Sequence, residues 1–307
     1  MSNEVACEAV ALREGLETSL DISSSGTSQR FLDFARNDRR EDTTQCLFSS
    51  LQVYHDVLPH SAAMNMAMDE ALLEHARIPS IRFYRWHSPA LSFGYFGRFR
   101  DVANHASARD VVRRWTGGGI VFHGDDLTYS IVIPVSDAVC NKSSMSLYEK
   151  IHRGLCNALI ANDERAELAV APAIADRGGT GCAMKTSVSD PGYNGRRSLK
   201  SAVGDRRCSN AEPATIGRNC SCFANPVRAD VMIHGRKVAG AAQRRTHAGL
   251  LQQGSIQGVE LEDGLASRFA EELSKNCEPR SLPNAVECRA REIAAQKYAT
   301  EAWLRKR

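Results

Sequence analysis

The chain has 307 residues, of which 43% are hydrophobic and 24% charged, the composition of an ordinary globular protein. Its 39 basic and 36 acidic residues leave a net charge of +3, too small to indicate nucleic-acid binding. No apolar run approaches the roughly 18 residues that span a bilayer, and no basic-then-apolar leader is present. We therefore expect a cytoplasmic protein that binds neither nucleic acid nor membrane.

Residues 1–45 mix charged residues with serine-rich stretches and lack hydrophobic periodicity. A segment of this kind cannot bury enough apolar surface to fold, so we predict a disordered extension before a globular part at 46–307. The ten cysteines lie at irregular spacings, unlike the framework of a small disulfide-rich secreted domain. We expect most of them to be reduced.

The globular part begins with a predicted strand over 47–57 and a helix for which Ser61 is a suitable N-cap. Two short β-rich runs follow, 81–86 and 91–95. The turn residues His87-Ser88-Pro89 separate them, and this pattern predicts a β-hairpin.

Three consecutive glycines, Gly117 to Gly119, follow a polar stretch compatible with a helix (100–109) and a predicted strand (111–115). Strands over 120–123 and 128–134 are expected to continue the same sheet beyond the glycines. Because glycine lets the backbone approach a ligand closely and aim amide groups at it, this segment is interpreted as a binding loop.

Beyond the loop, residues 173–219 are rich in Gly, Ser, Asn, Arg and Pro and are far longer than an ordinary connection. We predict a disordered insertion there. On either side of it, apolar periodicity predicts helices over 147–160, 262–275 and 284–305, and strands over 167–171, 228–233, 236–243 and 250–256.

Two segments carry a resemblance to a known family. The first runs from Arg113 to Gly119 and is followed by His123; the second is Cys222-Phe223 followed by the strand from Lys237 to Gln243. Together they resemble the biotin/lipoate protein ligase superfamily. Within it the chain is most similar to the cysteine-dependent octanoyltransferases of lipoate assembly, and it is also similar to the lipoate-protein ligases.

The resemblance covers residues 48–307 and implies one catalytic domain of the α/β (α+β) class, a mixed and mostly antiparallel sheet flanked by helices. Two positions depart from the transferase pattern. Gly119 stands where these enzymes often carry arginine, and Gln253 stands where histidine is common. Gly119 makes the chain slightly more similar to the ligases at this position.

By the same resemblance, Cys222 is the nucleophile that carries the acyl group as a thioester, and Lys237 is the second catalytic residue. Fifteen positions separate them, enough chain for a strand and a turn to bring the lysine back beside the thiol. An ammonium there favours the thiolate and stabilises negative charge on the acyl carbonyl oxygen.

The remaining implied site residues bind the substrate. The loop seats the acyl chain, Arg114 and His123 line the entrance, and small residues on the lysine strand leave room for an aliphatic chain. The predicted substrate-binding residues are Arg114, Thr116, Gly117, Gly118, Gly119, His123, Gly240 and Ala241.

The implied reaction moves an octanoyl group from acyl carrier protein to a lysine of a lipoyl domain, such as the glycine-cleavage H protein or an E2 subunit, and needs no cofactor. One alternative is a ligase that uses ATP and Mg²⁺ to form an acyl-adenylate, with Cys222 as apolar filler. Another is a non-catalytic acyl-binding protein. Zinc ligation by Cys182, Cys208, Cys220 and Cys222 is disfavoured, because they do not form two Cys-x-x-Cys pairs; we expect no metal site.

Overall fold

The computed structural model describes residues 46–160, 165–170, 225–261 and 264–306. The two predicted disordered segments, 1–45 and 173–219, lie outside these ranges, so their predictions stay predictions. Among the described residues, no helix is both long enough and apolar enough to cross a membrane.

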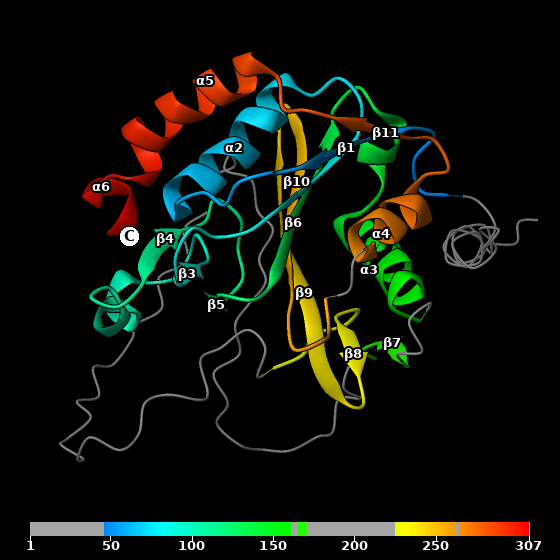
Figure 1. Cartoon of the computed structure of the whole chain (residues 1–307), viewed down its shortest axis with the longest axis horizontal. Coiled ribbons are helices and arrows are strands. Elements are labelled where there is room, and N and C mark those ends of the chain that lie inside the picture. The colour runs from blue at the N-terminus through cyan, green and yellow to red at the C-terminus, as the bar shows by residue number, and fades with distance from the viewer. Residues whose placement is uncertain (1–45, 161–164, 171–224, 262–263, 307) are drawn as a thin grey trace, which may run out of the picture. The chain divides into compact units, whose positions relative to one another are not determined.

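A large mixed sheet forms the centre of the fold (Figure 1). Its strand order is β11-β1-β2-β6-β10-β9-β8-β7. Strand β1 pairs in parallel with β2 and β11, and every other pair is antiparallel, which confirms the expected mixed and mostly antiparallel sheet. The strands are β1 Leu51–His55, β2 Ser80–Tyr84, β6 Leu127–Pro134, β7 Ala166–Leu168, β8 Val231–Ile233, β9 Arg236–Thr246, β10 Gly249–Ile256 and β11 Cys277–Arg280.

A second sheet of three strands carries the glycine loop. Strand β3 (Ala90–Phe93) lies at its centre, parallel to β4 (Asp110–Arg113) and antiparallel to β5 (Ile120–His123). The predicted hairpin of 81–86 with 91–95 is therefore wrong, because β1 and β6 already occupy both edges of β2. The expectation that one sheet continues past the glycines is confirmed for β5, which shares the sheet of β4, and is wrong for β6, which belongs to the large sheet.

Helices cover both faces of the large sheet: α2 and α5 lie on one side, and α3 and α4 on the other (Figure 1). The predicted polar helix at 100–109 is instead two short 3₁₀ turns, Phe99–Asp101 and Ala103–His105. The helices are α2 Ala62–His75, α3 Ser144–Ile160, α4 Leu265–Leu273, α5 Asn284–Ile293 and α6 Glu301–Leu304, with a 3₁₀ turn at Ala138–Asn141 and a π-helical turn at Ala294–Tyr298.

Alternating side chains along each central strand supply two hydrophobic cores. In β6, Ile131 and Ile133 pack towards α3 and α4, whereas Val132 packs towards α2 and α5. In β10, Leu250 and Leu251 divide between the cores in the same way. Strands buried on both faces tend to carry apolar runs, as Ile131 to Ile133 do in β6, whereas β10 also buries the polar residues Gln252, Gln253 and Ser255.

Helix α2 begins as predicted, since the Ser61 side chain accepts a hydrogen bond from the amide of Met64 at 3.3 Å. Beneath the helix lies a buried charge cluster, defined as Arg82, Asp69 and Asp56. Arg82 is fully buried and forms ion pairs of 2.7 Å with Asp69 and 2.5 Å with Asp56. The cluster joins β2 to the helix that covers it.

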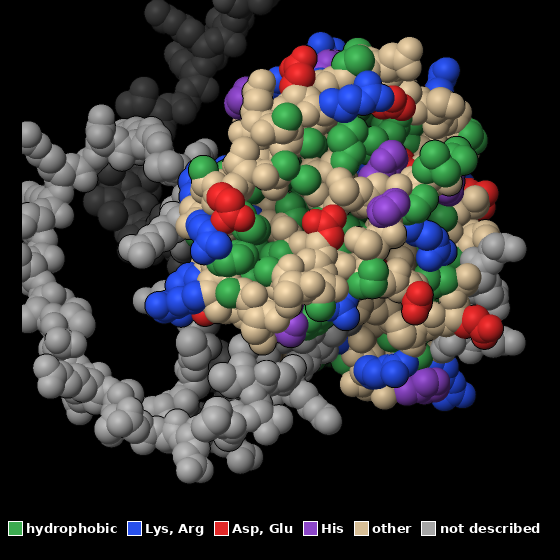
Figure 2. All heavy atoms as spheres, turned by 60° about the vertical axis from the view of Figure 1, so that its left-hand side comes forward, with side chains coloured by type: hydrophobic (Ala, Val, Ile, Leu, Met, Phe, Trp, Pro, Cys, Tyr) green, Lys and Arg blue, Asp and Glu red, His purple; other side chains and the backbone are tan. Residues whose placement is uncertain are grey.

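The surface visible in Figure 2 carries basic and acidic side chains interspersed with hydrophobic ones. The described residues on that face form no continuous basic stripe. This distribution agrees with the small net charge of the chain.

We predict that Arg82→Met lowers the free energy of unfolding by about 3–5 kcal/mol, because it leaves the two buried carboxylates without their shared cation. Urea unfolding measures the change. The matched control is Arg98→Met, at a side chain that is 64% exposed and lies 3.5 Å from Asp101. We expect this control to change stability by no more than about 0.5 kcal/mol; equal effects would contradict the assignment.

Candidate active site

The glycine loop joins β4 to β5 and packs closely against the end of β3. A Cβ atom placed on Gly94 would lie 2.1 Å from the carbonyl oxygen of Gly118 and 2.7 Å from the carbonyl carbon of Gly117. Both neighbours are backbone atoms, so position 94 must be glycine for the loop to lie where it does.

Arg114 holds the loop closed from inside. Its guanidinium donates hydrogen bonds to the carbonyls of Gly117 and Gly119 at 3.0 and 2.8 Å and to the Ser92 hydroxyl at 2.7 Å. The side chain is buried.

Arg113, the other member of the arginine pair, points elsewhere. It donates to the carbonyls of Tyr95 and Gly97 and to those of Trp303 and Leu304 near helix α6. This arginine therefore fastens the strand before the loop to the last described helix.

Thr116 ties the loop to the interior of the large sheet. Its hydroxyl donates to the Gln253 side chain at 2.7 Å, and the Gln253 amide donates to Asp69 at 2.7 Å. The loop is therefore connected through two hydrogen bonds to the buried charge cluster. Gln253, at the position where the family resemblance leads one to expect histidine, provides this connection.

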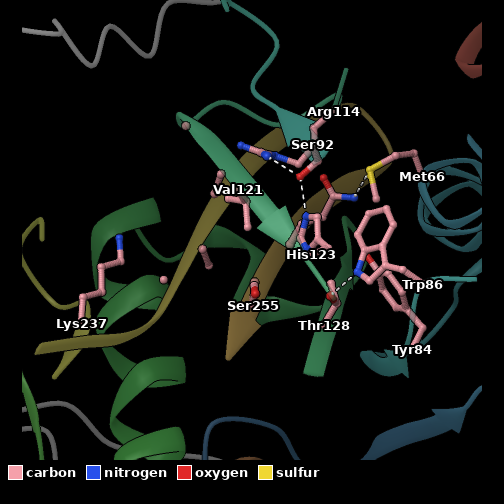
Figure 3. Close-up of a pocket in the computed structure, with 16 residues that line it drawn as sticks. Met66, Tyr84, Trp86, Ser92, Arg114, Val121, His123, Thr128, Lys237 and Ser255 are labelled. Atoms are coloured by element: carbon pink, nitrogen blue, oxygen red, sulfur yellow. Dashed lines mark hydrogen bonds between the residues drawn. The ribbon is translucent and has the colours of Figure 1, made fainter. Parts of the chain in front are cut away.

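A cavity of about 490 Å³ lies between the loop and strands β9 and β10 (Figure 3). Six predicted site residues line it: Arg114, Gly118, His123, Lys237, Gly240 and Ala241. Ala242, one of the small residues on the lysine strand that were expected to leave room for an aliphatic chain, lines it as well. The other lining residues were not predicted: Met66, Tyr84, Trp86, Ser92, Val121, Thr128, Gln253, Gly254 and Ser255.

Thr116, Gly117 and Gly119 do not line the cavity, although their bonds to Gln253 and Arg114 fix the loop that does. The unpredicted wall residues lie on α2, β2, β3, β5, β6 and β10, and one of them lies just after β2. Tertiary packing brings these separate elements together at the cavity. No short-range pattern in the sequence marks them.

His123 is buried and forms the centre of a hydrogen-bonded chain. Its Nδ1 lies 2.7 Å from Asp126 and its Nε2 lies 2.7 Å from the Ser92 hydroxyl, and its ring stacks on Trp86 at 4.0 Å. Burial lowers the pKa of His123 below its ordinary value, and the charges of Arg114 and Arg109 lower it further, against the opposing effect of Asp126. The imidazole is accordingly neutral near pH 7.

Lys237 lies apart from that chain of bonds, on the other side of Val121 and Ser255 in Figure 3. Its Nζ forms an ion pair of 2.8 Å with the buried carboxylate of Asp230. The side chain folds over Gly240, where a Cβ would lie 2.7 Å from Nζ. Glycine at this position is therefore what makes room for the lysine.

A β-bulge sets the direction of Lys237. Val231 pairs with Ala239 and Met232 pairs with Lys237, so β9 has one extra residue, Val238. A bulge shifts the alternation of side chains along a strand and re-aims the residue beside it. This shift puts Lys237 and Gly240 on the same face.

Cys222 and Phe223 lie outside the described residues, so the separation of the Cys222 thiol from Lys237 stays a prediction. The cysteines of the zinc alternative also lie outside. Within the described ranges, no group of three or more His, Cys, Asp or Glu side chains could hold a metal ion. The described cysteines are free, and none of them lines the cavity: Cys46, Cys140, Cys156, Cys277 and Cys288.

Comparison with known proteins agrees with the resemblance found in the sequence. The profile of the lipoyl protein ligase A/B catalytic domain matches residues 61–288. The octanoyltransferase LipM of Oceanobacillus iheyensis is 31% identical over 208 residues, which cover 64% of this chain and 60% of that protein. LipM of Halalkalibacterium halodurans is 26% identical over 292 residues, covering 78% and 94%.

Solved structures show the same fold. The bipartite lipoate protein ligase of Thermoplasma acidophilum superposes with a TM-score of 0.53 at 18% identity, covering 83% of this chain and 95% of that one. The match supports the expected single catalytic domain. The chain nevertheless spans only about three-fifths of the length of the first curated relatives that it matches.

We predict that Gly94→Ala lowers the free energy of unfolding by about 1–3 kcal/mol, because the new methyl group collides with the backbone of the glycine loop. Gly117→Ala is the matched control, since a Cβ there meets nothing within 4 Å. It should change stability by less than about 0.5 kcal/mol. Chemical denaturation measures both, and a Gly94→Ala protein as stable as its control would show that the loop does not pack as described.

Proposed function

Because the chain belongs to the family of lipoyl protein ligase A/B catalytic domains, we propose that it transfers an octanoyl group from acyl carrier protein, through a thioester on Cys222, to a lysine of a lipoyl domain. The observation that carries the proposal is the cavity itself. Its wall includes the apolar side chains of Met66, Trp86 and Val121, and the Lys237 ammonium lies at its edge.

Each part of the site has a role in two thioester steps. The Cys222 thiolate attacks the acyl carbonyl, the bond to the carrier sulfur breaks, and the carrier leaves as its thiol. A substrate lysine amine then attacks the enzyme thioester, forms the amide and releases Cys222. In both steps the Lys237 ammonium stabilises the negative charge that develops on the carbonyl oxygen.

The glycine loop and its supports shape the acyl site. Gly118 and Ala241 contribute small surfaces to the wall, so an aliphatic chain passes without collision. Arg114 fixes the loop, because its guanidinium donates hydrogen bonds to the carbonyls of Gly117 and Gly119 and to the Ser92 hydroxyl. Buried and neutral, His123 serves to order Ser92 and the wall around it.

The transferase reading needs neither ATP nor Mg²⁺, and its acceptors are lipoyl domains such as the glycine-cleavage H protein or E2 subunits. The names of the LipM relatives support this reading. The cytoplasmic location stays a prediction. An ATP-dependent lipoate or octanoate ligase is the second candidate, favoured by Gly119 in place of the arginine common in transferases.

The decisive experiment is intact-mass analysis after incubation with octanoyl acyl carrier protein, without ATP. We expect one octanoyl adduct on the wild-type chain and on Cys288→Ala, a control at an exposed cysteine, and none on Cys222→Ala. An adduct that survives Cys222→Ala, or transfer to an apo lipoyl domain only when ATP is added, would falsify the thioester route.

Replacement of Lys237 tests its proposed role in stabilising the oxyanion. Lys237→Ala should slow octanoyl transfer on the order of 100-fold, because it removes the group that stabilises the oxyanion. Single-turnover kinetics with preformed octanoyl-enzyme measures the loss. A rate within twofold of wild type would exclude Lys237 from the reaction.

A further inference from the structure

Two residues that the sequence did not single out surround Lys237. Asp230 precedes β8, is fully buried, and faces the Lys237 ammonium at 2.8 Å. Tyr148, on helix α3, donates a hydrogen bond from its hydroxyl to the second oxygen of Asp230 at 2.6 Å. Lysine, aspartate and tyrosine thus form one continuous polar chain from the cavity wall to α3.

The carboxylate of Asp230 is fixed from its own backbone side as well. One of its oxygens accepts a hydrogen bond from the amide of Val227 at 2.7 Å. The preceding residue, Ala229, has a φ of 65°, a strained value for a residue with a side chain. His152 holds that residue in place through a 2.6 Å bond to its carbonyl. The strained backbone at Ala229 therefore helps to direct the Asp230 carboxylate towards Lys237.

Tyr148 connects the same carboxylate to the strand that carries the lysine. Its oxygen accepts a hydrogen bond from the amide of Ala241 at 3.0 Å while its proton goes to Asp230. Ala241 and Gly240 both line the cavity. A single hydroxyl therefore fixes the distance between the acid and the wall against which the lysine lies.

We propose that Asp230 and Tyr148 are positioning residues that keep Lys237 as an ammonium folded over Gly240 at the cavity wall. The inference rests on the proposed function, in which that ammonium faces the acyl carbonyl. It adds the prediction that Lys237 works as a fixed cation and not as a base, since its proton is shared with a buried carboxylate.

Three described groups near the pair, His152, Tyr129 and Tyr148, keep their charge near neutral pH. Burial lowers the pKa of His152 to about 4, so this imidazole is neutral. Burial also raises the pKa of Tyr129, and burial together with the charge of Asp230 raises that of Tyr148.

The first test is the rate of octanoyl transfer from preformed octanoyl-enzyme in Asp230→Asn. Asparagine keeps an oxygen for the Val227 amide and removes the charge that pairs with Lys237. Without this ion pair the ammonium is no longer fixed over Gly240, so we expect transfer to slow at least tenfold. A rate within twofold of the wild-type rate, at unchanged thermal stability, would overturn the proposal.

Tyr148→Phe separates positioning from charge. It keeps the packing of the ring and removes the hydroxyl, so we expect kcat to fall roughly tenfold with little change in KM, in line with one lost charge-assisted hydrogen bond. Tyr54→Phe, whose hydroxyl donates to Gln52 away from the cavity, is the matched control and should leave both constants unchanged. An unchanged kcat in Tyr148→Phe, at unchanged thermal stability, would contradict the positioning role.

A readout that does not need activity separates this proposal from the function on which it rests. Competitive acetylation with trace acetic anhydride, read by peptide mass spectrometry, compares Lys237 with the exposed Lys275. We expect Lys237 to be protected in the wild type and to gain reactivity at least tenfold in Asp230→Asn at pH 8. A wild-type chain that forms no octanoyl adduct but shows this gain would refute the proposed function alone. Equal acetylation of both proteins would refute the positioning by Asp230.

Discussion

The ion pair between Arg82 and Asp69 is the interaction on which the rest of the structure depends. It stands where α2 crosses β2, and Asp69 also accepts hydrogen bonds from Ser130 on β6 and Gln253 on β10. Gln253 in turn receives the hydroxyl of Thr116. The position of the glycine loop is thus linked to a charge buried in the centre of the fold. Burying such a charge costs desolvation free energy, which its ion pair and hydrogen bonds must offset.

The cavity joins two electrostatic environments. On one side a lysine is paired with a carboxylate, and on the other burial holds His123 neutral between Ser92 and Asp126. When two neighbouring groups lie in different environments, one can be charged while the other is neutral, and each can then play a different role. The Lys237 ammonium therefore lies at the wall beside its carboxylate, whereas the guanidinium of Arg114 binds the loop carbonyls.

Features that depend on residues close together in the sequence were predicted correctly. The Ser61 cap, the buried strands β6 and β10 and the glycine loop all follow from short-range periodicity or residue type. The failures have non-local causes: β2 and β3 look like a hairpin, but the edges of β2 are occupied by strands from elsewhere in the chain. Likewise, no spacing reveals that Ser92 and Asp126 meet at His123, or that a bulge at Val238 turns Lys237 over Gly240. Cys222 is predicted by family resemblance and stays a prediction.

The hydrogen bonds of Arg113 to the carbonyls of Trp303 and Leu304 span about 190 positions of sequence. During translation, the strand that leads into the glycine loop emerges long before these acceptors exist. At that stage the Arg113 guanidinium has only the carbonyls of Tyr95 and Gly97 among these acceptors, and the bonds to Trp303 and Leu304 form once α6 docks. The strand that leads into the glycine loop is therefore fastened to α6 only after residues 303 and 304 have been synthesised.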